Sequence, residues 1–181
     1  VRDEPTLRAA LEFMREYDAG PSAVRYPRER VPEPLPGDVP PFVLGKAHLV
    51  APGTAAAILA YGYPVVTALK ARSILAAEGP LVSVYDARFA KPLDRDLIRD
   101  LVRAGIPILT LEDHQVNGGF GSCVLEACNE MGLPIDAVQR AGLPDRFIPH
   151  GSRREQEAEA GIDADTLAHR LRPLVRRDRG A

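Results

Sequence analysis

The chain has 181 residues, 45% of them hydrophobic, so it can bury one core and is expected to form one compact unit with an appendage. Its 23 Lys and Arg residues nearly balance its 25 Asp and Glu residues, which argues against binding to nucleic acid or to an anionic membrane. The longest apolar stretch, residues 55–60, is too short to span a membrane, and the N-terminus does not resemble a signal peptide. We therefore expect a cytoplasmic protein.

The cysteines and the first residue further restrict the interpretation. Cys123 and Cys128 lie in a segment predicted to be helical, where a separation of five residues points their side chains about 140° apart, so they cannot form a disulfide with each other. The chain has no Cys-x-x-Cys motif and its histidines are scattered, so no spacing predicts a zinc or iron site. Because it begins at Val1, directly before a possible helix cap, we expect a piece of a longer protein.

The N-terminal part is predicted to contain a helix, a short strand and a linker. Asp3 can cap a helix whose apolar residues recur at helical spacing, and Gly20-Pro21 would stop it. Residues 23–26 suit a short strand. Six prolines within residues 27–41 exclude a helix or a central strand, so an extended linker and a domain boundary are predicted there.

After the linker, predicted strands and helices alternate. The strands are expected at residues 45–50, 55–61, 81–85, 107–111 and 135–139. The helices are expected at residues 64–78, between Asp94 and Gly105, at residues 122–131, after the Ser152-x-x-Glu155 capping box, and after Asp163. Helices of this length between strands imply right-handed crossovers and a largely parallel sheet. The pattern therefore predicts a three-layer α/β/α domain with a helix–strand segment before it.

A glycine-rich turn lies at residues 117–122, Asn-Gly-Gly-Phe-Gly-Ser, between a predicted strand and a predicted helix. The free N–H groups at a helix N-terminus could bind a phosphate. However, the turn matches neither the dinucleotide-binding fingerprint nor the P-loop. Because small residues also let a helix pack closely against its neighbours, we favour a structural role over an anion site.

Three ionisable residues, Glu112, Asp113 and His114, follow a predicted parallel strand. Open α/β sheets place functional groups at this edge, and an acid with a histidine could transfer protons. No nucleophile elbow or catalytic triad accompanies them. We therefore expect these side chains to be solvated or paired with a neighbouring domain.

Two basic clusters could bind phosphate. Arg88 and Lys91 lie close to Asp94, but a capping role for Asp94 and a basic pair that faces water or a partner explain this segment better than a phosphate clamp does. In Arg25-Tyr26-Pro27-Arg28, the planar guanidinium groups would suit a phosphate or carboxylate, and a solvated surface pair is an equally good interpretation. No Gly-Asp-Gly motif with a later Asn, the signature of a magnesium and thiamine-diphosphate site, is present.

Four segments carry a family resemblance when they are taken together. They are Pro-Ser-Ala-Val-Arg-Tyr-Pro-Arg at 21–28, Asp-Ala-Arg-Phe with Lys-Pro-Leu-Asp at 86–94, Gly-Gly-Phe-Gly-Ser at 118–122, and Gly-Leu-Pro-Asp-Arg-Phe-Ile with His-Gly at 142–151. Their order and spacing resemble the C-terminal portion of the 1-deoxy-D-xylulose-5-phosphate synthase family, in the transketolase superfamily. The resemblance covers the chain from about residue 21 to residue 152.

The resemblance implies a division of the chain. Residues 1–29 would end a pyrimidine-binding domain, residues 30–41 would form the linker, and residues 42–181 would form a transketolase C-terminal-like domain. This domain is expected to be a three-layer α/β/α fold whose mostly parallel sheet has one antiparallel edge strand.

The family's reaction is a thiamine-diphosphate-dependent transfer that joins pyruvate to glyceraldehyde 3-phosphate, for isoprenoid and thiamine synthesis. Its thiamine diphosphate and Mg²⁺ are held by domains that this chain lacks. We therefore expect no catalytic, cofactor-binding or metal-binding residue here and no activity from the chain alone. The complete enzyme is expected to be a homodimer that this domain stabilises.

Arg28 is the single residue for which the resemblance implies a role in substrate binding. It matches the second arginine of the family's Arg-Tyr-Pro-Arg motif, which contacts the phosphate of the acceptor. The family continues with Gly, whereas this chain has Glu29, whose carboxylate could compete for Arg28. Two alternatives stay open: an equivalent piece of a transketolase or a 2-oxoacid dehydrogenase β subunit, or an autonomous anion-binding module that uses residues 118–122.

Overall fold

The computed structural model describes residues 1–26 and 30–175, which form a central five-stranded sheet in the order β1-β3-β2-β4-β5. The strands are β1 (His48–Ala51), β2 (Ala57–Ala60), β3 (Ser83–Asp86), β4 (Ile108–Gln115) and β5 (Val138–Leu143). Strands β2 to β5 pair in parallel, while the edge strand β1 pairs antiparallel with β3. This confirms the predicted sheet with one antiparallel edge strand.

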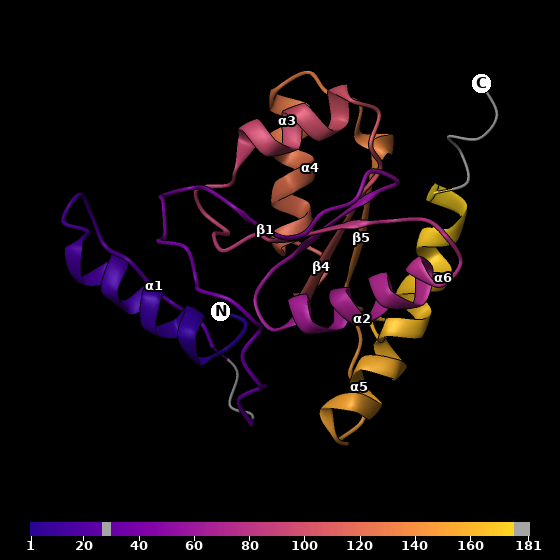
Figure 1. The fold of residues 1–181 in the computed structure, drawn as a ribbon, viewed down its shortest axis with the longest axis horizontal. Helices are drawn as coiled ribbons and strands as arrows, with labels where there is room; N and C mark the ends of the chain where they lie inside the picture. Colours follow the sequence, from indigo (N-terminus) through magenta and orange to yellow (C-terminus); the bar gives the residue numbers. More distant parts are fainter. Residues whose placement is uncertain (27–29, 176–181) are drawn as a thin grey trace.

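Helices cover both faces of the sheet (Figure 1). Helices α2 (Pro64–Ala76) and α6 (Ala164–Val175) pack on one face, and α3 (Arg95–Arg103) and α4 (Phe120–Glu130) pack on the other. The remaining helices are α1 (Glu4–Glu16), which stands beside the sheet, α5 (Arg153–Ala160), and the short 3₁₀ turn η1 (Ile135–Ala137). No helix in the described part of the chain is long and apolar enough to cross a membrane.

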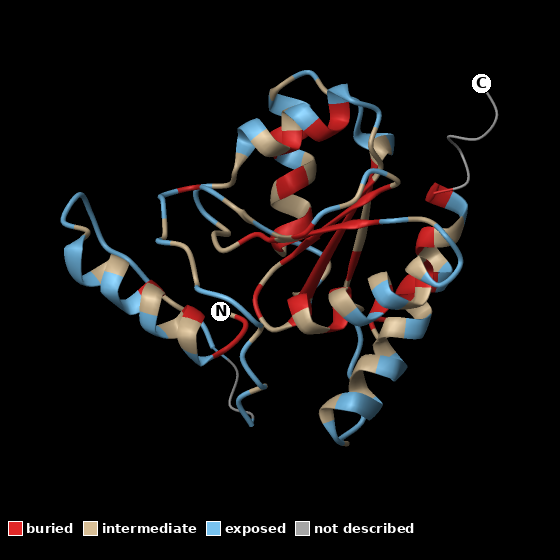
Figure 2. Cartoon of the chain, viewed as in Figure 1, coloured by how far each residue is buried: buried red, intermediate tan, exposed pale blue. Residues whose placement is uncertain are grey.

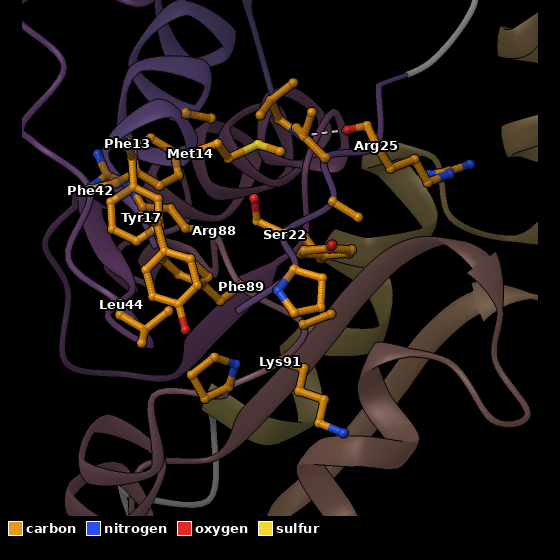
Figure 3. Close-up of a pocket in the computed structure, with 18 residues that line it drawn as sticks. Phe13, Met14, Tyr17, Ser22, Arg25, Phe42, Leu44, Arg88, Phe89 and Lys91 are labelled. Atoms are coloured by element: carbon orange, nitrogen blue, oxygen red, sulfur yellow. Dashed lines mark hydrogen bonds between the residues drawn. The ribbon is translucent and has the colours of Figure 1, made fainter. Parts of the chain in front are cut away.

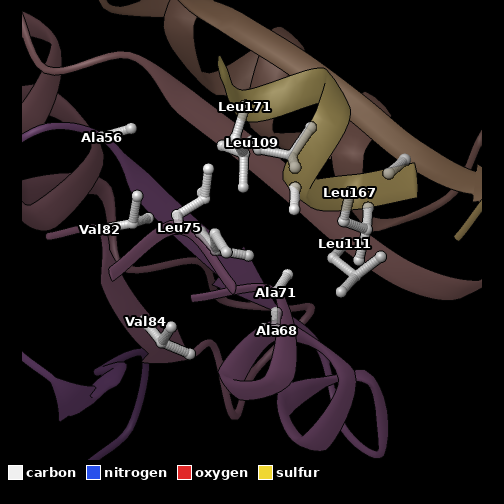
Figure 4. Close-up of a cluster of buried hydrophobic side chains, with 14 of the residues drawn as sticks. Ala56, Ala68, Ala71, Leu75, Val82, Val84, Leu109, Leu111, Leu167 and Leu171 are labelled. Carbon is white, nitrogen blue, oxygen red and sulfur yellow. The ribbon is translucent and has the colours of Figure 1, made fainter. Parts of the chain in front are cut away.

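The buried side chains divide into two clusters because successive residues of a strand point to opposite faces. Ile58 of β2 packs in the cluster with Leu75 of α2 and Leu171 of α6, part of which Figure 4 shows. The next residue, Leu59, packs in the other cluster with Val124 of α4. Burial is concentrated in the sheet and on the inner sides of the helices (Figure 2), so the predicted three layers are confirmed.

Four of the described helices, α1, α3, α5 and α6, begin where the sequence predicts caps. The side chains of Asp3, Asp94 and Asp163 each accept a hydrogen bond from the backbone N–H three residues further along. Ser152 and Glu155 form the predicted capping box at the start of α5. Because these bonds satisfy backbone donors that have no partner within the helix, they explain why local sequence alone locates these helix starts.

Several predicted boundaries are wrong. Residues 23–26 have no regular secondary structure, because a strand needs a neighbour and none of the described strands pairs with this segment. Helix α1 ends at Glu16, before the predicted stop at Gly20. The last strand, β5, is displaced because residues 135–137 form a 3₁₀ turn after Pro134.

Strand β4 continues past the predicted end at residue 111. Its last part contains the three ionisable residues Glu112, Asp113 and His114, and the backbone N–H of Val116 still donates to the carbonyl of Leu143 at the end of β5. The sequence does not predict this extension, because a buried strand is recognised by its apolar residues and residues 112–115 are polar.

Candidate functional site

The carboxyl ends of β2, β3 and β4 form the edge where open α/β sheets usually bind ligands. Glu112, Asp113 and His114 lie at this edge at the end of β4. The fold brings two arginines against them, Arg25 from the N-terminal segment and Arg153 from the first residue of α5. This cluster is the candidate site that the structure assembles from separate parts of the chain.

Asp113 is the centre of the cluster. Its Oδ1 accepts a hydrogen bond of 2.9 Å from Nη1 of Arg25, and its Oδ2 accepts one of 3.2 Å from Nη2 of Arg153. Burial alone would raise the pKa of Asp113, but the hydrogen bonds and positive charges of Arg25 and Arg153 outweigh burial and lower this pKa below its usual value. Asp113 is therefore paired within this chain, with arginines that lie 88 and 40 residues away in the sequence.

Glu112 caps helix α4 although it belongs to a strand. Its fully buried carboxylate accepts hydrogen bonds from the backbone N–H groups of Phe120, at 2.6 Å, and Gly121, at 2.8 Å. Burial raises the pKa of Glu112, and the two backbone hydrogen bonds only partly oppose it. Because an internal carboxylate takes these two donors, the arrangement argues against an external anion at this helix N-terminus.

Gly119 is required here by close packing. A β-carbon at this position would collide with the carboxylate of Glu112 and with the carbonyl oxygen of Gln115. The φ angle of Gly119 is −86°, which other residues adopt, so backbone conformation is not the reason for glycine. This contact supports the structural interpretation of residues 117–122.

His114 does not complete a proton relay. Its Nδ1 lies 3.8 Å from both Oε2 of Glu112 and Oδ1 of Asp113, which is too long for a hydrogen bond. Burial, followed by the charge of Arg25, lowers the pKa of His114, and its ring stacks on Tyr61 with 5.7 Å between the centroids. In this structure the cluster holds separate segments of the chain together.

The described residues offer no metal site. Among residues 1–26 and 30–175, no group of three or more His, Cys, Asp or Glu side chains could hold a metal ion. Both cysteines are free thiols.

A cavity of about 340 Å³ lies where α1 meets the main domain (Figure 3). Phe13 and Tyr17 of α1 line it together with Phe42 and Phe89, and the rings of Phe13 and Phe89 pack edge to face with 5.7 Å between their centroids. The side chain of Arg25 points away from this aromatic wall (Figure 3). Sequence reasoning missed the cavity because its aromatic residues come from three distant segments.

Arg88 differs from its prediction. The sequence suggested an exposed side chain, yet Arg88 is half-buried and donates hydrogen bonds of 3.0 Å to the carbonyl oxygens of both Pro40 and Pro41. Its guanidinium lies over the ring of Phe42, 4.3 Å from the centroid. Arg88 thus fastens the proline-rich segment to the domain, so its terminal nitrogens are not free to clamp a phosphate. Lys91 is exposed, as predicted.

Comparisons with known proteins identify the fold. Residues 45–167 match the family described as "Transketolase, C-terminal domain". The chain belongs to this family. Among individual relatives, 1-deoxy-D-xylulose-5-phosphate synthase of Thermus thermophilus is 46% identical over 94% of this chain, and that of Thermomicrobium roseum is 44% identical over 93%. These matches confirm the resemblance found in the four segments.

The transketolase C-terminal domain accounts for only part of its relatives. The chain spans 26% of the Thermus protein and 27% of the Thermomicrobium protein. The solved structure named "Split gene transketolase, inactive beta4 tetramer" superposes with a TM-score of 0.85 at 29% identity, covering 97% of this chain and 56% of its own. Transketolase from Leishmania mexicana, with a TM-score of 0.55 at 20% identity over 74% of this chain and 18% of its own, shows the fold alone.

The predicted substrate-binding residue, Arg28, lies outside the described residues, as does Glu29. The structure describes the chain up to Tyr26 and therefore includes Arg25, the first arginine of the same motif. Its ion pair with Asp113 attaches the beginning of this motif to the transketolase C-terminal domain.

Proposed function

We propose that this chain is the C-terminal portion of a thiamine-diphosphate-dependent transferase that converts pyruvate and glyceraldehyde 3-phosphate into 1-deoxy-D-xylulose 5-phosphate and carbon dioxide. The observation that carries the proposal is the 46% identity, over nearly the whole chain, with a relative named for this activity. The complete enzyme would supply precursors for isoprenoids and thiamine, and it would work as a cytoplasmic homodimer.

Within that enzyme, the chain has a mainly structural role. We assign residues 1–29 to the end of the pyrimidine-binding domain, 30–41 to the linker and 42–181 to the third domain. The engagement of Glu112 and Asp113 in hydrogen bonds within the chain supports this role. Thiamine diphosphate and Mg²⁺ would be held by the preceding domains, so the chain alone would bind neither and would be inactive.

The alternatives have less support. A C-terminal piece of a transketolase or a 2-oxoacid dehydrogenase β subunit would be expected to resemble those enzymes most, yet the named transketolase structures are only 19–29% identical to this chain. An anion-binding module would need the N–H groups of Phe120 and Gly121, and Glu112 already occupies them.

The proposal can be tested by comparing this chain with the complete polypeptide. Isothermal titration of thiamine diphosphate with Mg²⁺ should give no binding heat with residues 1–181 at micromolar concentrations, and clear binding with the complete polypeptide. Only the complete polypeptide should release 1-deoxy-D-xylulose 5-phosphate. Micromolar binding by the chain alone, or a complete polypeptide that makes no product, would contradict the proposal.

A further inference from the structure

The loop after β5, residues 144–149, carries the most exposed large apolar side chain of the described residues. Phe147 has a relative exposure of 102%, so its ring contacts almost nothing in this chain. The loop and Gln115 also line an open concavity of about 610 Å³. Aromatic side chains are enriched where proteins contact one another.

The loop is held by hydrogen bonds with its neighbours, although the ring of Phe147 is fully exposed. Nε2 of Gln115 donates to Oδ1 of Asp145 at 2.5 Å, and Nη2 of Arg146 donates to Oε1 of Glu159 at 2.7 Å. Asp145 and Arg146, the two residues before Phe147, are therefore tied to β4 and to α5. Because the backbone is already ordered, burying the ring against a partner would cost little additional conformational entropy.

The loop lies next to a contact that the N-terminal segment already makes. Arg2 pairs with Asp86 at the end of β3, and Arg25 pairs with Asp113 at the end of β4. Strand β5 follows β4 in the sheet, and the loop with Phe147 begins at its carboxyl end. The segment 1–26 therefore covers the edge from β3 to β4, while the adjoining position at β5 presents a bare ring.

We propose that Phe147 and the loop 144–149 form a docking surface for the part of the polypeptide that precedes Val1. This inference rests on the proposed function, since it requires that part to be present. The relatives contain roughly three-quarters of their length outside the matched region, given that the chain spans 26–28% of them. Val1 lies against Gly62, just beyond the end of β2, so a preceding polypeptide would leave the domain at the same edge of the sheet as this loop.

Aromatic anchors of this kind commonly dominate interfaces, because a rigid ring excludes water over a large area when it enters a pocket. The expected partner surface is accordingly an apolar recess with a polar rim. Arg146 and Asp145 already have partners within the chain, so the recess needs no matching charge for either.

Hydroxyl-radical footprinting of the unmodified protein tests the proposal, because phenylalanine and leucine side chains both react with the radical. In residues 1–181 alone, Phe147 should be oxidised at the rate of a fully exposed ring. In the complete polypeptide, its oxidation should be slowed at least about tenfold, which corresponds to an open population of about one-tenth. Leu81, which is 50% exposed before the amino end of β3, is the matched control and should react equally in both proteins.

A substitution gives an independent measurement. Phe147→Ala should leave the melting temperature of residues 1–181 unchanged, because the ring has no contacts there, and should lower that of the complete polypeptide by several degrees. Leu81→Ala should change the melting temperature of both proteins by the same amount.

Equal oxidation of Phe147 in both proteins would overturn the proposal. Protection that appears in residues 1–181 alone as their concentration rises would also overturn it, since a second copy would then be the partner. Neither readout depends on enzyme activity, so a failed activity assay leaves this test unaffected.

Discussion

Asp113 and Arg25 are 88 residues apart in the sequence, yet Oδ1 of Asp113 accepts a 2.9 Å hydrogen bond from Nη1 of Arg25. The second oxygen of the same carboxylate binds Arg153, whose guanidinium lies over the ring of Tyr63. One side chain at the end of β4 therefore connects the N-terminal segment, the start of α5 and the sheet. Bonds of this kind are stronger than neutral ones because both partners are charged.

Replacing Asp113 should weaken the folded chain. Asp113→Asn keeps the shape but removes the charge and one acceptor, so the free energy of unfolding should fall by about 1–2 kcal/mol, less than for a fully buried pair because Arg25 is 51% exposed. Urea unfolding at pH 7 measures this loss. Glu130→Gln is the control, because its pair with Arg95 is exposed on both sides and should contribute at most about 0.5 kcal/mol.

The effect of Asp113 should also depend on pH. Its pKa is lower in the folded chain than in the unfolded chain, so the unfolded chain binds the proton more readily in acid. Its stabilisation should be complete above the unfolded pKa, about 4, and should be lost as pH falls through the folded pKa. The difference between parent and Asp113→Asn should therefore shrink below about pH 4. A difference that stays constant down to pH 2, or an equal loss in Glu130→Gln, would show that the charge is not responsible.

The sequence predicts those parts of the fold that local interactions decide. Asp94 marks the start of α3 because a helix cap needs only a side chain and a backbone N–H three residues away. The antiparallel edge strand and the three layers follow from the family resemblance and from the alternation of strands and helices. In contrast, residues 23–26 have a strand-like composition, but their conformation depends on a neighbour that the local pattern does not reveal.

The candidate site was predicted only in part. Its acidic residues could be located at the edge of the sheet, because the end of a parallel strand is recognisable in the sequence. Their partners could not, since Arg25 and Arg153 approach Asp113 only after the chain has folded. The buried position of Glu112 was missed for the same reason: its hydrogen-bond donors are backbone groups of α4.

Gly119 should tolerate no larger residue. In Gly119→Val, the new side chain would displace the Glu112 carboxylate from the N-terminus of α4 and leave a buried charge with fewer partners. We expect a loss of at least about 2–3 kcal/mol in the free energy of unfolding, measured by urea titration. Gly20→Ala is the control, because a β-carbon there meets nothing within 4 Å, and it should stay within about 0.5 kcal/mol of the parent. If Gly119→Val melts within a degree of the parent, close packing is not the reason for this glycine.

Two substitutions of Asp94 should lower the free energy of unfolding by different amounts. Its carboxylate accepts hydrogen bonds from the backbone N–H groups of Leu97 and Ala47, and it also pairs with Lys46. Asp94→Ala removes all three contacts and should lower the free energy of unfolding by about 1–2 kcal/mol. Asp94→Asn loses the charge and the acceptor for Ala47 but keeps an oxygen that can cap α3, so it should lose less. Thermal unfolding followed by circular dichroism compares the two. An equal loss in both variants would mean that the contacts of Asp94 with Lys46 and Ala47 matter more than the cap.

The role of Arg28 must be tested in the complete polypeptide, because the acceptor site would be shared with the preceding domains. If Arg28 holds the acceptor's phosphate, Arg28→Ala should reduce kcat/KM for glyceraldehyde 3-phosphate by about ten- to a hundredfold, the equivalent of about 1.5–3 kcal/mol. The efficiency toward pyruvate should hardly change, because pyruvate has no phosphate. Arg28→Lys should restore only part of the loss, since an ammonium group keeps the charge but not the planar pair of donors.

Steady-state kinetics with each substrate varied in turn would decide the Arg28 prediction. Because the phosphate is remote from the reacting carbonyl, part of its binding energy can act in the transition state, so the loss can appear in kcat as well as in KM, and their ratio is the quantity to compare. Arg8→Ala is the control: this arginine on α1 is 78% exposed and should leave both efficiencies unchanged. An Arg28→Ala variant that stays within twofold of the parent for glyceraldehyde 3-phosphate would make Arg28 an ordinary surface arginine. If Arg28→Ala lowers kcat/KM equally for both substrates, Arg28 has a general structural role, because only a contact with the phosphate would distinguish the acceptor from pyruvate.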